Sequence, residues 1–252
     1  MPYLDRNGVQ IWYEEHGRGP AVLLTHGYGA TATMWEPQIR GLDCYRLIVW
    51  DIRGHGRSDS PEDPSAYSVP ACLADMAAIL DACGVDRAVI GGLSLGGYLS
   101  LAFLLDYASY VRALMLFDTG PGYRKQEGRN AWNAMAERYA QALEARGLAG
   151  LGSTGELRPT DHRSARGLAR AARGILTQHD ARVIDALSAV QVPALVLWGE
   201  RDEAFVKPGE TMAAKIPGAR RLVVAGAGHA ANLDRPAEFN AALTQFLESV
   251  GA

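Results

Sequence analysis

The segment that most restricts the possible folds is Gly92–Gly96, which stands between an apolar run and a helical pattern. The apolar run covers residues 87–93 and is typical of a buried strand, and the helical pattern covers residues 95–107. A serine at the tip of a sharp strand-to-helix turn is the context of a nucleophile elbow, which exposes the hydroxyl above the sheet edge. Glycines two positions on either side avoid side-chain collisions there. We therefore expect Ser94 to be a nucleophile, with an ordinary helix N-cap as the alternative.

Two later apolar runs end in residues that can complete a serine triad. Residues 193–198 lead into a loop with Asp202, and residues 220–225 lead into a glycine-rich loop with His229. The order serine, acid, histidine along the chain is the order that this architecture uses. The imidazole is needed to take the serine proton during attack, and the carboxylate holds the imidazole in the correct tautomer. We therefore expect Asp202 and His229 to be catalytic.

The acid has alternatives. Asp118 ends another apolar run, at residues 112–118, and some folds of this kind take the acid from that earlier strand. Glu200 and Glu203 lie close to Asp202 in sequence but match the expected position less well. Two other histidines are interpreted structurally: we expect His26 to shape a neighbouring loop and His55 to serve a turn.

The negative oxygen of a tetrahedral intermediate requires hydrogen-bond donors that already point at it. One donor is expected from the backbone N–H of Leu95, directly after the nucleophile. The second is expected from the loop His26-Gly27-Tyr28-Gly29, which follows an apolar run at residues 21–25. Within that loop we assign the donor to the backbone N–H of Tyr28.

The rest of the chain alternates strand and helix patterns. Asn7-Gly8 precedes an apolar run and predicts an opening hairpin. Further patterns predict a strand at residues 45–51 and helices at residues 70–83 and 236–248. This alternation predicts an α/β protein with a mostly parallel sheet that helices cover on both faces. We expect residues 1–119 and 190–252 to form that core.

Residues 120–189 interrupt the alternation, because no strand pattern occurs there. Helical stretches are expected near residues 128–146, 162–178 and 180–188. We interpret this insertion as a helical cap that covers Ser94 and shapes a pocket. Four of its residues could line that pocket or could equally pack the cap on the core: Tyr123, Trp132, Met135 and Tyr139.

Composition and charge narrow the possible partners. A net charge of -3 gives no reason to expect nucleic acid, and no apolar run is long enough to span a membrane. No metal-ligand spacing, phosphate-binding loop or dinucleotide fingerprint occurs, so no metal and no cofactor are expected. The start of the chain lacks a signal-peptide pattern, and Cys44, Cys72 and Cys83 are interpreted as reduced thiols, so a cytoplasmic protein is expected. We expect it to be a monomer or a homodimer.

Five motifs in order resemble the α/β-hydrolase superfamily. They are His26-Gly27, the stretch from Asp51 to Ser58, the elbow at Ser94, the loop at Asp202 and the loop at His229. The resemblance implies the α/β-hydrolase fold with a cap. Residues 92–97 and 226–236 are most similar to the group of serine esterases and 3-oxoadipate enol-lactonases.

Residues at single positions distinguish this chain from related enzyme classes that have other activities. Haloalkane dehalogenases and related epoxide hydrolases use an aspartate nucleophile, whereas this chain has Ser94. Gly29 stands where many cofactor-free haloperoxidases have proline, and Ala230 stands where C–C hydrolases of the meta-cleavage type commonly have tryptophan. The resemblance therefore implies a hydrolase of small carboxylic esters or lactones that forms an acyl-enzyme on Ser94. A C–C bond hydrolase and a low-turnover binding protein with this fold are the alternatives.

Overall fold

A computed structural model describes residues 3–251 and contains an eight-stranded sheet. The strand order is β1-β2-β4-β3-β5-β6-β7-β8. The two pairs β1–β2 and β2–β4 are antiparallel, and all the other pairs are parallel. The expected mostly parallel sheet is thus confirmed. The strands are β1 (Tyr3–Arg6), β2 (Val9–His16), β3 (Ala21–Thr25), β4 (Arg46–Trp50), β5 (Ala88–Leu93), β6 (Val111–Phe117), β7 (Ala194–Gly199) and β8 (Arg220–Val224).

The chain opens with the expected hairpin. Arg6 pairs with Val9, and Asn7 and Gly8 between them have φ angles of 57° and 85°. Two positive φ angles in succession are the requirement of a tight hairpin turn whose twist matches the strands, which is why asparagine and glycine occupy it.

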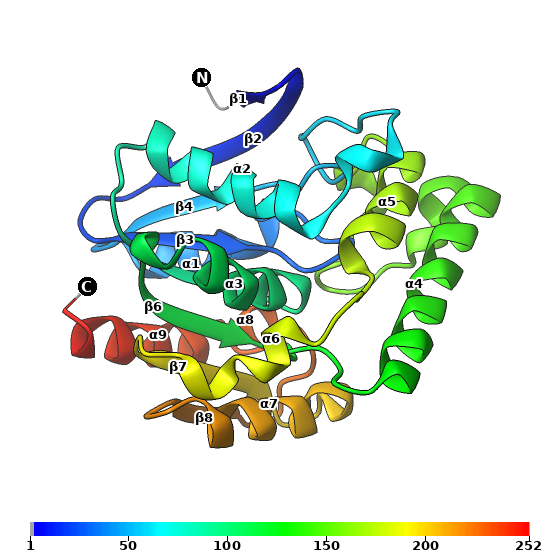
Figure 1. Ribbon diagram of the computed structural model, residues 1–252. Coiled ribbons are helices and arrows are strands. Elements are labelled where there is room, and N and C mark those ends of the chain that lie inside the picture. The colour runs from blue at the N-terminus through cyan, green and yellow to red at the C-terminus, as the bar shows by residue number, and fades with distance from the viewer. Residues whose placement is uncertain (1–2, 252) are drawn as a thin grey trace.

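Helices cover both faces of the sheet because the central strands are buried on both faces. Leu23 of β3 packs into the same cluster as α2 (Val69–Ala82) and α3 (Leu95–Asp106). The flanking Val22 and Leu24 pack into the cluster on the opposite face, which also contains residues of α9 (Pro236–Ser249). In Figure 1, α2 and α3 lie in front of the strands and α9 lies behind them. The other α-helices of the core are α1 (Glu36–Gly41), α7 (Glu203–Lys215) and α8 (Ala231–Asp234).

Residues 120–189 connect β6 to β7 and are here called the helical insertion. Its helices are α4 (Gln126–Arg146), α5 (Ala165–Ala171) and α6 (Arg182–Asp185), and a π-helical turn covers Ala172–Leu176. Figure 1 shows α4 and α5 at the right, beyond the arrowhead of β6.

The expected helices over 162–178 and 180–188 are longer than those observed. Ser164 caps α5, since its hydroxyl accepts the N–H of Gly167, so the helix begins only at Ala165. The turn around Gly174 then packs so closely on the backbone of Tyr67 that a Cβ there would collide with it. After α4, the insertion therefore follows the surface of the core in short helical segments.

Candidate active site

Ser94 occupies a strained turn between β5 and α3. Its φ of 54° and ψ of -115° lie in a region that non-glycine residues rarely adopt. The turn is held by the N–H of Ser94, which donates to the carbonyl of Phe117 at 2.9 Å. A Cβ at Gly96 would collide with the carbonyl of Thr25, and a Cβ at Gly92 would lie 2.7 Å from the same oxygen. These close approaches explain the glycines of the elbow, and such strain is typical of functional sites.

Asp202 and His229 meet at the ends of neighbouring strands β7 and β8. Nδ1 of His229 lies 2.7 Å from Oδ2 of Asp202, and the ring of Phe205 stacks on the imidazole with centroids 4.9 Å apart. Asp202 is 7% exposed. Because a carboxylate can only accept hydrogen bonds, this contact requires the proton of the neutral ring on Nδ1, which leaves the lone pair of Nε2 to accept a proton. His229, Asp202 and Ser94 all line one cavity.

Asp118, the alternative acid, makes different contacts. Its side chain is fully buried, and its Oδ1 accepts the N–H of Gly199 at 2.7 Å. Burial raises the pKa of Asp118 well above its usual range, and the negative charge of Asp202 raises it further. Of the rival glutamates, Glu200 accepts the N–H of Gly226, away from the imidazole. Asp202 is therefore the acid in contact with His229.

The two backbone N–H groups expected to bind an oxyanion, those of Tyr28 and Leu95, lie near Ser94. A Cβ at Gly27 would lie 3.4 Å from the Cβ of Ser94, so the loop after β3 passes directly beside Ser94. Within the described residues, the N–H of Tyr28 has no recorded acceptor. The N–H of Leu95 begins α3, where the first N–H groups of a helix lack partners in the helix.

The Tyr28 loop is held from below by His26. Nδ1 of His26 lies 2.7 Å from the carbonyl of Gly27, and its Nε2 accepts the N–H of Ile52 at 2.9 Å. Burial lowers the pKa of His26 to about 4, so the ring is neutral with both nitrogens in use. His26 therefore shapes the loop, as expected, and has no nitrogen left to act as a base.

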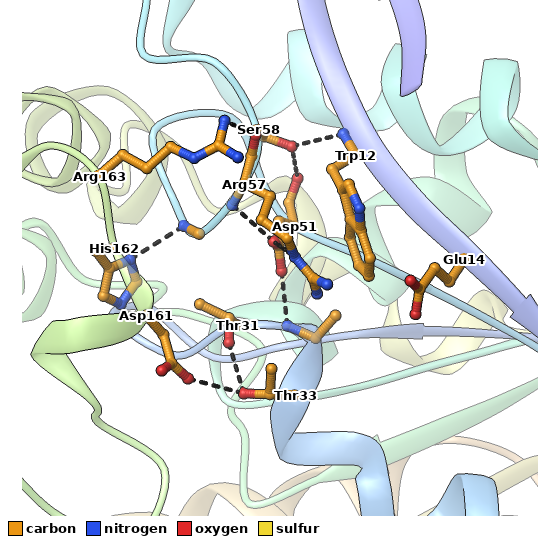
Figure 2. Close-up of polar contacts among 12 residues, drawn as sticks. Trp12, Glu14, Thr31, Thr33, Asp51, Arg57, Ser58, Asp161, His162 and Arg163 are labelled. Atoms are coloured by element: carbon orange, nitrogen blue, oxygen red, sulfur yellow. Dashed lines mark hydrogen bonds and ion pairs between the residues drawn. The ribbon is translucent and has the colours of Figure 1, made fainter. Parts of the chain in front are cut away.

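The loop is held from the side by Asp51, which follows β4. Its Oδ1 accepts the N–H of Ala32 at 2.7 Å, and its Oδ2 accepts the N–H of Arg57 at 2.8 Å (Figure 2). The hydroxyl of Ser58 donates to the carbonyl of Asp51 at 2.5 Å and accepts the N–H of Trp12. The motif from Asp51 to Ser58 thus fastens the loop after β3 to the rest of the core.

His162 of the helical insertion joins the same network, which sequence reasoning missed. Its Nε2 lies 2.8 Å from the carbonyl of Gly29. Its Nδ1 accepts the N–H of Gly56 at 3.1 Å, as Figure 2 shows. Burial lowers its pKa and so favours the neutral ring that these two bonds need. No local pattern could have found this residue, because its partners are 133 and 106 positions away in the sequence.

The cavity at Ser94 has a volume of about 490 Å³ and lies between the core and the helical insertion. Its lining is mostly aromatic and aliphatic, and it includes the four residues expected from the insertion: Tyr123, Trp132, Met135 and Tyr139. Of these, Trp132 also donates from Nε1 to the carbonyl of Leu176 at 2.7 Å, and Tyr139 stacks on Tyr28. Among the described residues that line it, Glu156 and Asp202 are the charged carboxyls and none is lysine or arginine.

Residues 3–251 contain no group of three or more histidine, cysteine, aspartate or glutamate side chains placed to hold a metal ion. Over the same residues, no helix combines the length and the apolar character needed to cross a membrane.

Comparison with known proteins agrees with this fold. A family model described as alpha/beta hydrolase fold matches residues 20–154. The 3-oxoadipate enol-lactonase 1 of Acinetobacter baylyi is 28% identical over 269 residues, with 98% of this chain and 96% of that protein covered. A thermophilic esterase from Thermogutta terrifontis superposes with a TM-score of 0.85 at 28% identity and covers 100% of this chain and 98% of that one. The enol-lactonase of Burkholderia xenovorans LB400 superposes with a TM-score of 0.77 at 26% identity, covering 98% and 100%.

Proposed function

Because this chain belongs to the alpha/beta hydrolase family, we propose that it is a serine hydrolase of small, uncharged carboxylic esters or lactones. The observation that carries the proposal is the 2.7 Å contact between His229 and Asp202 inside the cavity that Ser94 also lines. The chain's relatives include esterases and enol-lactonases, which agrees with hydrolysis of this class of bond.

In the proposed reaction, His229 removes the proton of the Ser94 hydroxyl through Nε2 while the serine oxygen attacks the substrate carbonyl. Asp202 stabilises the imidazolium that forms. The backbone N–H groups of Tyr28 and Leu95 bind the negative oxygen of the tetrahedral intermediate. His229 then gives its proton to the departing alcohol, which leaves an acyl-enzyme on Ser94.

Deacylation repeats the sequence with water as the nucleophile. His229 takes a proton from the water as its oxygen attacks the acyl carbonyl, and the second tetrahedral intermediate is bound by the same two N–H groups. The proton on His229 then returns to the oxygen of Ser94, and the acid is released. For a lactone, the alcohol and the acid are the two ends of one product.

The character of the cavity supports an uncharged substrate. A substrate carboxylate would lose its hydration there without meeting a lysine or arginine among the described lining residues. Glu156 on the same wall would repel it. The volume of about 490 Å³ lies in the range typical of small-molecule sites.

We further propose that residues 120–189 act as a cap over this site and that Tyr123, Trp132, Met135 and Tyr139 contact the substrate. The stacking of Tyr139 of the insertion on Tyr28 of the core supports this role, since it joins the two parts at the cavity. A cap of this kind keeps bulk water from the acyl-enzyme except where the deacylating water enters.

The test is a hydrolysis panel with wild type and Ser94→Ala measured together. It contains p-nitrophenyl butyrate, its matched anionic analogue mono-p-nitrophenyl glutarate, several lactones and one dienone C–C substrate. We expect Ser94-dependent hydrolysis of uncharged substrates, with kcat/KM for the glutarate lower by about tenfold or more, equivalent to about 1.4 kcal/mol. Wild-type turnover by folded Ser94→Ala would refute the mechanism, and preference for the dienone would move the assignment to C–C hydrolysis.

A further inference from the structure

Two carboxyl groups lie next to each other at the ends of neighbouring strands, and the proposed reaction uses only one of them. Asp118 directly follows β6 and Asp202 follows the neighbouring strand β7, where Phe117 pairs with Leu197. Asp118 is 0% exposed and Asp202 is 7% exposed. Asp118 also adopts a φ of 43°, one of three positive φ angles at non-glycine positions among residues 3–251. A strained, buried carboxyl next to an active site needs a physical explanation.

Each of the two carboxyl groups has a recorded hydrogen-bond partner, among the described residues, for only one of its oxygens. Oδ1 of Asp118 accepts the N–H of Gly199 at 2.7 Å, but its Oδ2 is buried without a recorded partner. Oδ2 of Asp202 receives His229, and for its Oδ1 no donor is recorded among the described residues. An ionised carboxylate can only accept hydrogen bonds, so two of them cannot bond to each other. Their negative charges also repel, and burial strengthens this repulsion. A proton on Oδ2 of Asp118 would let this buried oxygen donate to Oδ1 of Asp202.

We propose that Asp118 is a positioning residue that keeps a proton on Oδ2 and donates it to the free oxygen of Asp202. The inference rests on the proposed function, because Asp118 acts only through Asp202. The bond fixes the orientation of the Asp202 carboxylate toward His229. It also leaves a single negative charge on the pair and draws electron density from Asp202, which moderates how strongly the imidazolium is held.

The surroundings of Asp118 favour this protonation. Burial is the main reason that its pKa is raised, and Asp202 is the titratable group that faces it, from the loop after β7. His229, from the loop after β8, reaches it only through Asp202. The remaining polar groups directed at the carboxyl are the backbone N–H groups of Gly199 and Ala231, which lower its pKa in part.

The test compares the pH dependence of kcat/KM in wild type, Asp118→Asn and Asp118→Leu, with Glu203→Gln as the control for loss of a carboxyl from the same region. Asparagine tolerates a positive φ, and its amide N–H can donate to Asp202 in place of the carboxyl proton. The acid limb of the pH profile should therefore stay where it is in wild type. Leucine removes the donor, so Asp202 holds the imidazolium more strongly. The acid limb should then move to higher pH by about one unit.

Other outcomes overturn the inference. An ionised Asp118 requires that Asp118→Asn and Asp118→Leu both move the acid limb to lower pH, because each removes a negative charge near His229. A merely structural role requires that Asp118→Leu lose stability with its acid limb unchanged.

A second measurement does not depend on the leucine variant folding. Infrared difference spectra of wild type against Asp118→Asn at pH 7.5 should contain the C=O band of a protonated carboxyl, and its absence contradicts the inference. Failure of the proposed function is recognised separately, by turnover that persists in Ser94→Ala.

Discussion

Replacement of Asp202 by asparagine removes the carboxylate and leaves the size of the side chain unchanged. In the wild type, Nδ1 of His229 lies 2.7 Å from Oδ2 of Asp202, so the charge centres of carboxylate and imidazolium are about 4 Å apart. At an effective dielectric constant of about 20, this separation corresponds to about 4 kcal/mol. Since about 1.4 kcal/mol changes a rate tenfold, kcat should fall by about 10³ in Asp202→Asn.

A change in the tautomer of His229 adds to this loss of kcat. The amide of asparagine can donate to Nδ1, which places the proton of the neutral ring on Nε2 and blocks it as a base; such a change costs up to about 10⁴ in a serine triad. The side chain of His229 is 33% exposed, however, so water replaces part of the lost stabilisation. An expected loss of about 10³ therefore includes both effects.

The assay is steady-state hydrolysis of p-nitrophenyl butyrate at pH 7.5, with circular dichroism to confirm folding. The matched control is Glu203→Gln, which removes an exposed carboxylate from the next position in the chain and should change kcat less than about twofold. A loss of less than tenfold in folded Asp202→Asn would refute the assignment of the acid.

Three further predictions concern the scaffold. Gly96→Ala should abolish activity or folding because its Cβ would collide with the carbonyl of Thr25, whereas Gly155→Ala, with its nearest atom at 3.9 Å, should be neutral in both assays. Asp75→Asn leaves buried Arg53 without its charged partner and should lower the free energy of unfolding in urea by about 3–5 kcal/mol. The pKa of His26 is about 4 in the folded chain, below its usual 6.5, so its stabilising contribution is complete above pH 6.5 and is lost as the pH falls toward 4. In urea unfolding, the free energy of unfolding should therefore be lower at pH 4.5 than at pH 7.5. This difference should be smaller in His26→Gln than in wild type.

Much of the core could be predicted from sequence because its signals are local. The elbow is recognisable from glycines at fixed positions around Ser94, and Asn7-Gly8 alone indicates the hairpin. The carboxyl ends of parallel strands lie at one edge of the sheet, so residues after separate strands, such as Asp202 and His229, can meet although 26 positions lie between them. The mostly parallel sheet and the family are confirmed on this basis.

The parts that could not be predicted depend on contacts between distant segments. His162 has no strand-end motif around it, and it matters because the insertion folds back onto Gly29 and Gly56. The raised pKa of Asp118 depends on its burial beside Asp202, which no spacing of residues reveals. Residues 162–178 are helical in composition and predict one long helix, whereas the α-helix ends at Ala171 and a π-helical turn, Ala172–Leu176, packs on the backbone of Tyr67.

The most direct test of the central claim is to trap the acyl-enzyme. Wild type and Ser94→Ala are mixed with an ester that deacylates slowly, quenched in acid and examined by intact-protein and peptide mass spectrometry. The account predicts that the wild type gains the mass of one acyl group, located on the peptide that contains Ser94, and that Ser94→Ala gains none. An acyl group on another residue, or rapid turnover of the ester by Ser94→Ala, would contradict it.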